Sequence, residues 1–280
     1  MCAVISEVFE SDPRRIGYSG LSEPIRYSEK SEECVLYLLT PWDKEVPHPL
    51  VVFVQGSAWQ RPNPLHQLPQ LSSLSRRGYA VAAVVHRNCL NGHPFPAYLR
   101  DVKCAIRFLR ANAEKYRIDP ERVAVWGTSS GGNTALLTAV TGDDPAYKTD
   151  EYAEYSDSVK LCVSCFGPAD MMNMPGAREP QAELNPIVKA LSGDADPYGV
   201  MDRMSPALLV DPSKTYPPTL LLHGDADPVV PFDQSERMFG ALSKAGADVK
   251  LIRVSGAVHE GNFWSEKLLE RIFTYITERI

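Results

Sequence analysis

Residues 122–133 read RVAVWGTSSGGN, and this stretch decides how the chain folds. A short apolar run ends in a glycine, two serines follow, and a glycine pair leads into the helical pattern NTALLTAV. Residues 127–131, GTSSG, match G-x-S-x-G, a motif that requires a strand before it and a helix after it. Both flanks fit, so the sequence predicts a sharp strand-to-helix turn that lifts the hydroxyl of Ser129 above a sheet.

A glycine-rich turn after a strand also suits a phosphate. A P-loop ends in Gly-Lys-Ser/Thr, however, whereas Gly132 is followed by Asn133, and the chain contains no G-x-G-x-x-G. From the pentapeptide alone a catalytic serine and a plain turn both stay open.

Runs rich in β-branched residues alternate with longer amphipathic runs along the rest of the chain. Such alternation predicts an α/β fold, a mostly parallel sheet flanked by helices, with ligands bound beyond the carboxyl ends of the strands. The predicted strands are 34–40, 50–54, 79–86, 122–127, 159–166, 219–224 and 248–254. The predicted helices are 64–77, 97–116, 130–141, 231–245 and 264–279.

Neither an internal repeat nor a linker divides the 280 residues, so we expect a single domain, 1–280. Residues 1–33 are polar and irregular and form an N-terminal extension. Residues 167–217 are long for a connection, rich in proline, and carry Met171, Met172 and Met174 close together. We predict a lid-like insertion over the carboxyl edge of the sheet, with an inert surface excursion as the alternative.

Composition and charge exclude several classes of protein. A net charge of −6 gives no electrostatic reason to expect nucleic acid, and no apolar run approaches the ~18 residues that span a membrane. The N-terminus lacks the pattern of a signal peptide. Cys162 and Cys165 lie in a predicted strand and face opposite sides, so they are expected to be buried thiols and not a metal site. These features predict a cytoplasmic protein without a metal, and they leave open whether it forms a homodimer.

A nucleophilic serine needs a histidine base and a carboxylate that orients the base. Only His223 and His259 follow Ser129 in the chain. Asp225 and Asp227 come directly after His223 at a strand end, so the order Ser, Asp, His leaves His259 as the base. Of the two acids we favour Asp227, because Asp225 follows the strand glycine directly and suits a loop-stabilising role.

An oxyanion needs backbone N–H donors from two places. One is Ser130, at the start of the predicted helix after the nucleophile. The other is the stretch Gly56, Ser57 and Ala58, three small residues after a predicted strand. Trp59 follows them and is a candidate wall of the substrate pocket, or else a packing aromatic.

Several stretches together resemble the α/β-hydrolase carboxylesterases, in particular the bacterial feruloyl esterase, acetyl-xylan esterase and lipase-like esterase branch. The stretches are FVQGSAW, FPAYLRDVKCAIRFLRANAEKYRIDPERVAVWGTSSGG, MSPALLV, PPTLLLHGDADPVVP and VSGAVHEG. The resemblance implies an α/β-hydrolase fold and the triad Ser129, Asp227 and His259. Where such enzymes commonly have H-G-G-G-W, this chain has QGSAW, and we favour Ser57 with Ser130 as donors. The elbow serine is usually followed by alanine, which is Ser130 here.

The resemblance also implies ester hydrolysis without a cofactor, on small acylated molecules. Acetyl esters of plant-cell-wall sugars fit best, with feruloyl esters next, so the expected partner is a small ester or an acylated oligosaccharide. Arg87 and Asp101 match a structural pair that braces the sheet against a helix. The alternatives are a prolyl-oligopeptidase-like peptidase, which normally carries a large N-terminal propeller, and a non-catalytic protein, which would be expected to lose a triad member.

Overall fold

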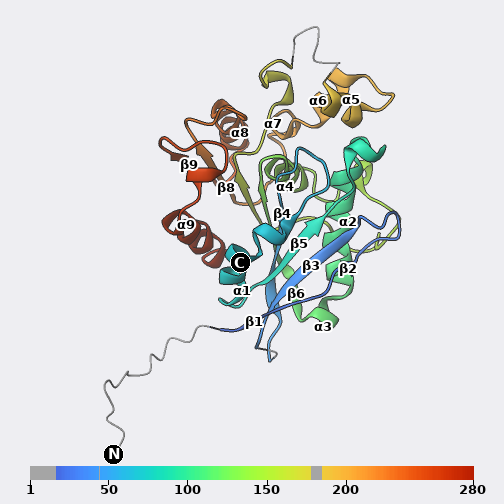
Figure 1. Ribbon diagram of the computed structural model, residues 1–280, viewed down its shortest axis with the longest axis vertical. Coiled ribbons are helices and arrows are strands. Elements are labelled where there is room, and N and C mark those ends of the chain that lie inside the picture. Colours follow the sequence, from blue (N-terminus) through green and yellow to red (C-terminus); the bar gives the residue numbers. More distant parts are fainter. Residues whose placement is uncertain (1–16, 44, 178–184) are drawn as a thin grey trace, which may run out of the picture.

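A twisted sheet forms the centre of the molecule in the computed structural model, which describes residues 17–43, 45–177 and 185–280 (Figure 1). Within these residues the sheet has nine strands in the order β1-β3-β5-β4-β6-β7-β8-β9, and β2 pairs with β3 outside this path. The strands are β1 (Ser19–Leu21), β2 (Ile25–Arg26), β3 (Val35–Pro41), β4 (His48–Val54), β5 (Ala80–Val85), β6 (Ile118–Thr128), β7 (Leu161–Cys165), β8 (Thr219–Gly224) and β9 (Val249–Val254).

Strands β4 to β9 all pair in parallel, as the alternating pattern predicts. Strand β3 runs antiparallel to β5. Residues 42–47 join β3 to β4 and are too few for a crossover, so β4 runs opposite to β3, and β5 is parallel to β4. The expectation that residues 1–33 are irregular is wrong for β1 and β2, which pair antiparallel with β3. These strands have two or three residues each, too few to show an alternating pattern.

Helices cover both faces of the sheet, and each face has its own apolar core. Helices α2, α4 and α8 pack on one face with the Val52 side of β4, whereas α1 and α9 pack on the other with Phe53. The helices are α1 (Leu68–Ser75), α2 (Ala97–Ala111), α3 (Ala113–Tyr116), α4 (Ser130–Val140), α5 (Pro186–Ser192), α6 (Pro197–Arg203), α7 (Pro206–Leu209), α8 (Asp233–Lys244) and α9 (Glu266–Thr277).

The predicted helix 97–116 is divided into α2 and α3. Asn112 leaves the helical region, with φ −112° and ψ 24°, and its side-chain amide donates to the carbonyl of Phe108. Asparagine competes for backbone groups in this way and therefore favours helix ends. Near the start of α2, Asp101 accepts hydrogen bonds of 2.8–3.1 Å from the guanidinium and the backbone N–H of Arg87. This is the bracing pair that the resemblance implies.

The described part of the insertion 167–217 contains short helices joined by loops. Helices α5, α6 and α7 lie together at the top of Figure 1, and residues 178–184 lie outside the described residues. Leu191, Val200 and Met201 from the insertion join a third apolar cluster with Tyr98 and Leu99 of α2. The insertion is therefore packed against the body of the fold; its action as a lid stays a prediction.

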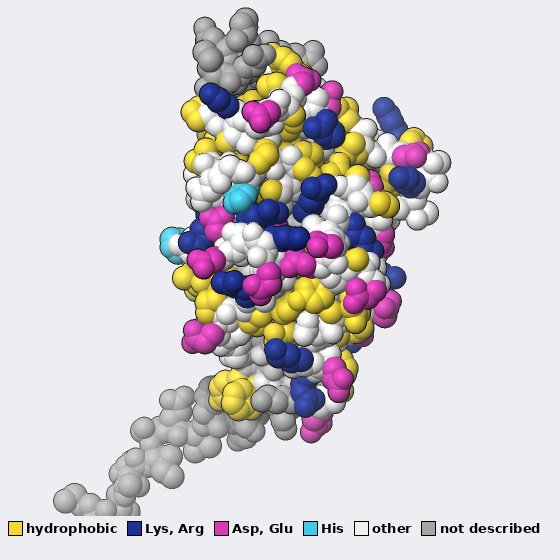
Figure 2. Space-filling view, turned by 90° about the vertical axis from the view of Figure 1, so that its right-hand side faces the viewer, with side chains coloured by type: hydrophobic (Ala, Val, Ile, Leu, Met, Phe, Trp, Pro, Cys, Tyr) yellow, Lys and Arg dark blue, Asp and Glu magenta, His cyan; other side chains and the backbone are white. Residues whose placement is uncertain are grey.

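The two thiols of the C-x-x-C sequence lie on opposite faces of β7. Cys162 belongs to the core beside α2 and Cys165 to the core beside α9, so the pair cannot chelate one ion. Burial raises the pKa of Cys165 to about 12. In the described chain no helix is long and apolar enough to cross a membrane. On the face shown in Figure 2, basic and acidic side chains are interspersed and form no continuous basic strip.

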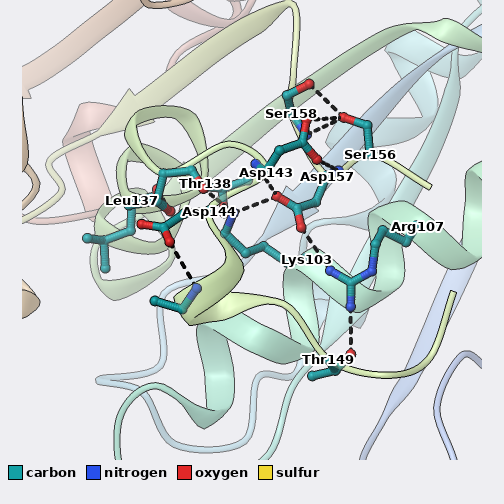
Figure 3. Close-up of polar contacts among 12 residues, drawn as sticks. Lys103, Arg107, Leu137, Thr138, Asp143, Asp144, Thr149, Ser156, Asp157 and Ser158 are labelled. Atoms are coloured by element: carbon teal, nitrogen blue, oxygen red, sulfur yellow. Dashed lines mark hydrogen bonds and ion pairs between the residues drawn. The ribbon is translucent and has the colours of Figure 1, made fainter. Parts of the chain in front are cut away.

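A buried group of charges ties α2 to the loop that follows α4 (Figure 3). The side chains of Lys103, Arg107 and Asp157 are fully buried. The Asp157 carboxylate lies 2.6 Å from the Lys103 ammonium and 2.8 Å from the Arg107 guanidinium. The ammonium also donates to the carbonyl of Thr141, and the guanidinium to the hydroxyl of Thr149. One carboxylate thus faces two buried cations.

Candidate active site

A strained turn carries Ser129 between β6 and α4. Its backbone has φ 51° and ψ −124°, a region that residues other than glycine enter only where the surrounding structure enforces it. The turn is tight because Gly131 lies against β4: a Cβ there would sit 2.0 Å from the carbonyl oxygen of Val54. The Ser129 N–H donates to the carbonyl of Cys165. This is the strand-turn-helix elbow that the G-x-S-x-G pattern predicts.

Three side chains from separate strand ends meet above this turn. The imidazole Nε2 of His259 lies 2.9 Å from Oγ of Ser129, and Nδ1 lies 2.7 Å from Oδ2 of Asp227. Because the carboxylate accepts the Nδ1–H, Nε2 is left as the acceptor for the serine hydroxyl. The other oxygen of Asp227 accepts the N–H groups of Val229 and Val230 at 2.8 and 2.9 Å. The arrangement has the hydrogen-bond order of a Ser-His-Asp triad.

Asp225 has a different environment from Asp227. Its carboxylate accepts the Gly256 N–H at 2.6 Å and the Arg253 guanidinium at 2.7 Å, and these bonds hold the pKa of the carboxyl below its usual value. It therefore joins the ends of β8 and β9. The structure places Asp227, and not Asp225, against His259.

Asparagine at each of the two positions distinguishes their roles. We expect Asp227→Asn to reduce kcat/KM for p-nitrophenyl acetate by about 10⁴-fold, because an amide leaves the imidazole in the wrong tautomer. We expect Asp225→Asn to cost less than about tenfold, because it weakens loop contacts only. Initial rates for the two purified variants measure both values. A larger loss at Asp225 would reverse the assignment.

The loop 55–59 lies beside the elbow, and its N–H groups are not equivalent. The Gly56 N–H donates to Oγ1 of Thr128 and the Ser57 N–H to Oγ of Ser130, both at 2.9 Å. The Ala58 N–H meets no acceptor in the part of the chain that the structure describes. Of the three candidates in this loop, Ala58 is thus the one whose N–H has no acceptor among the described residues, and the choice of Ser57 as donor stays a prediction.

The Ser57 N–H has an acceptor because the residue after the nucleophile is a serine. An alanine after the nucleophile has no hydroxyl, whereas Ser130 has one, and this hydroxyl captures the Ser57 N–H. The backbone N–H of Ser130 itself is in the first turn of α4, where N–H groups lack partners within the helix. Ala58 and Ser130 thus provide N–H groups on both sides of the nucleophile.

An apolar pocket of about 390 Å³ opens at Ser129. Ala58, Trp59 and Ser130 line it on the side of the sheet, and Trp59 is only 7% exposed. The insertion supplies most of the remaining walls: Pro168, Met171, Met174, Pro175, Gly176, Ala177, Asn185, Ile187, Val188, Leu191 and Met201. Trp59 therefore lies at the pocket, as predicted, and the insertion forms one side of it.

Two further residues lie beside the triad, and neither of them is assigned a role from the sequence. The ring of Phe166 packs edge-on against His259, with centroids 4.7 Å apart, and its backbone φ is 41°. His223 is buried, donates from Nε2 to the carbonyl of Val230, and lies 3.4 Å from Asp227. Burial lowers the pKa of His223, which favours a neutral ring beside the acid. Phe166 directly follows β7 and His223 lies in β8, and in the sequence both look like core positions of apolar runs.

Comparison with known proteins assigns the family. The family described as BD-FAE matches residues 36–242, about three quarters of the chain. The chain belongs to the BD-FAE family. Esterase LipC of Mycobacterium tuberculosis is 31% identical to it over 218 residues, which are 76% of this chain and 53% of LipC. This BD-FAE chain spans about half the length of the curated relatives that it matches.

Solved structures resemble this BD-FAE chain over nearly its whole length. A truncated form of a carbohydrate esterase from gut microbiota superimposes with a TM-score of 0.82 at 29% identity, covering 96% of this chain and 99% of that one. The bifunctional GH43-CE of Bacteroides eggerthii also gives 0.82, at 31% identity, covering 92% of this chain and 38% of its own. The predicted α/β-hydrolase fold is confirmed.

Proposed function

We propose that this BD-FAE chain is a serine carboxylesterase that cleaves its substrate through an acyl-enzyme. The observation that carries the proposal is the hydrogen-bonded series from Ser129 through His259 to Asp227 at the mouth of an apolar pocket. The printed names of the relatives, an esterase and a carbohydrate esterase, support an ester as the bond that is cleaved.

In the proposed mechanism Ser129 attacks the ester carbonyl while His259 accepts its proton at Nε2. Asp227 keeps the imidazole in the required tautomer and stabilises the imidazolium. The N–H groups of Ala58 and Ser130 donate to the oxyanion, and a single such donor contributes roughly 10²–10³ in kcat. His259 then protonates the leaving alcohol, and water repeats the sequence on the acyl-enzyme. The proton that reaches the alcohol comes from the Ser129 hydroxyl, and the attacking water supplies the proton that returns to Ser129 through His259.

We assign the acyl group to the apolar pocket. Its walls are hydrocarbon and thioether, and Asn185 is its polar lining residue apart from the two serines. An acetyl group would fill little of about 390 Å³. The size of the pocket therefore supports a longer or aromatic acyl group, such as butyryl or feruloyl, and this proposal reverses the order of acetyl before feruloyl that the resemblance implies. For the alcohol, the description of one structural relative as a carbohydrate esterase supports a sugar, and the plant-cell-wall origin of that sugar rests on the sequence resemblance alone.

A series of p-nitrophenyl esters tests this assignment. From acetate to propionate to butyrate we expect kcat/KM to rise by about fourfold per methylene, because each buried CH₂ contributes about 0.8 kcal/mol. Val188→Phe, which narrows the pocket, should flatten the series. A maximum at acetate in both proteins would contradict the acyl assignment.

An amide substrate separates the esterase from the peptidase alternative. We expect hydrolysis of p-nitrophenyl butyrate, and we expect no release of p-nitroaniline from an aminoacyl-proline p-nitroanilide. The reverse result would favour a peptidase, and inactivity on both substrates would favour a non-catalytic protein.

A further inference from the structure

A second, smaller crevice lies on the other side of the candidate triad. It has a volume of about 180 Å³ and lies between the first turns of α1 and α9, above Phe53 of β4 and Trp126 of β6. Glu260, which directly follows His259, also lines it. The crevice shares no lining residue with the apolar pocket. We propose that it binds a single neutral sugar ring, the alcohol part of the ester; this inference rests on the proposed function.

The crevice contains two carboxamides and a carboxylate, and one of their acceptor atoms lacks a hydrogen-bond donor among the described residues. The side-chain oxygen Oε1 of Gln67 is buried without a hydrogen-bond partner, and Gln70 lies one helical turn farther on. Buried polar atoms are almost always hydrogen-bonded in native proteins, so an unpaired acceptor in a crevice indicates a ligand that brings a donor. Glu260 adds a carboxylate, of which one oxygen accepts the indole N–H of Trp264.

Glu260 has an unusual backbone conformation, and its carboxylate is hydrogen-bonded to Trp264. Its φ of 63° and ψ of −146° belong to a region that glycine normally occupies. A side chain at such a position persists only where its surroundings fix it, and here the Trp264 hydrogen bond does so. Hydroxyl groups can donate to a carboxylate and to a carboxamide oxygen, so a ligand with several hydroxyl groups suits this lining.

Aromatic rings supply the other half of the recognition. The indole N–H of Trp264 donates to Glu260, so the rest of the Trp264 ring that lines the crevice is hydrocarbon. Phe53 and Trp126 also line the crevice and pack edge-on, with ring centroids 5.2 Å apart. A pyranose has hydroxyl donors on its rim and C–H groups on its faces, which matches acceptors surrounded by aromatic carbon. The crevice has no cationic lining residue, so it does not suit an anion.

The position of the crevice relative to His259 fits the alcohol and not the acyl group. The imidazole delivers its proton to the leaving alcohol, so the alcohol lies on the His259 side of the reacting carbonyl. Trp264 contacts Phe166 with centroids 6.0 Å apart, and Phe166 contacts His259 at 4.7 Å. The apolar pocket, by contrast, is lined by Ser129 itself. The two halves of the ester would therefore bind on the two sides of the triad.

Direct binding of an unacylated sugar tests the proposal without turnover. We would titrate methyl β-D-xylopyranoside into the full chain and follow tryptophan fluorescence, to which Trp126 and Trp264 contribute, with saturation-transfer NMR as a second readout. We expect saturable binding, weakened about fivefold or more by Gln67→Leu because one hydrogen bond to the sugar is lost. Because Oε1 of Gln67 has no partner in the unliganded fold, the leucine variant should fold normally, which thermal unfolding checks.

The matched control is Met201→Ala in the apolar pocket, which should leave sugar binding unchanged. Absence of saturable binding up to the solubility limit would overturn the proposal, as would binding that responds to Met201→Ala but not to Gln67→Leu. Neither result bears on the esterase itself, because activity on p-nitrophenyl butyrate is measured separately. Loss of that activity with sugar binding intact would overturn the proposed function alone.

Discussion

Ser129→Ala is expected to abolish ester hydrolysis, with kcat lowered by about 10⁴-fold or more. Removing the hydroxyl leaves His259 without a nucleophile to activate, while the pocket and the N–H groups of Ala58 and Ser130 stay in place. The measurement is kcat for p-nitrophenyl butyrate in the purified variant, with substrate binding followed in parallel. We expect the variant to bind its substrate with little change.

The adjacent serine provides the matched control. Ser130→Ala keeps the backbone N–H but removes the hydroxyl that accepts the Ser57 N–H. We expect a loss of about five- to tenfold, the value of one hydrogen bond. Equal losses at the two positions, or substantial activity in Ser129→Ala, would mean that the nucleophile is assigned wrongly.

Asp157→Asn is expected to lower the free energy of unfolding by about 3–5 kcal/mol, the range found when one partner of a buried ion pair is removed. The substitution keeps the size of the side chain and removes the carboxylate charge that is paired with both buried cations, Lys103 and Arg107. Burial already lowers the pKa of Lys103, so the ammonium depends on its carboxylate partner. Urea unfolding followed by circular dichroism measures the change.

Two variants test the explanation by charge. Lys103→Met leaves a balanced pair of Arg107 and Asp157 and should cost clearly less than Asp157→Asn. Asp150→Ala removes the partner of Lys30 in an exposed ion pair and should change stability little, because solvent screens such pairs. If Asp157→Asn were no more harmful than Asp150→Ala, the buried cluster would not support the fold as we describe.

Local sequence patterns predicted most of the fold because they are set by burial. Strands β4, β5, β7 and β8 are buried along their whole length, so each is largely apolar and stands out from its surroundings. Strands β1 and β2 are edge strands that pair only with β3, and nothing in their few residues requires a strand. The direction of β3 follows from the shortness of one connection, which the alternation of elements does not reveal.

The candidate site was predictable to the extent that chemistry dictates order along the chain. Ser129, Asp227 and His259 each follow a strand, and parallel strands bring such positions to one edge. The sequence does not show which N–H group of residues 56–58 is without an acceptor, because this depends on which of them donates to the hydroxyl of Ser130. The crevice likewise depends on the tertiary fold, which brings α1 and α9, about 200 residues apart in sequence, to the same face of the sheet.

The separate walls of the two pockets have a consequence for how selectivity can change. Residues of the insertion surround the apolar pocket, whereas α1 and the region 260–269 surround the crevice. Substitutions at distant sites without shared partners usually have additive effects on free energy. Substitutions selected separately in the lining of the apolar pocket and in the lining of the crevice should therefore combine without further optimisation. In evolution, the preference for the acyl group can change while the preference for the alcohol stays the same.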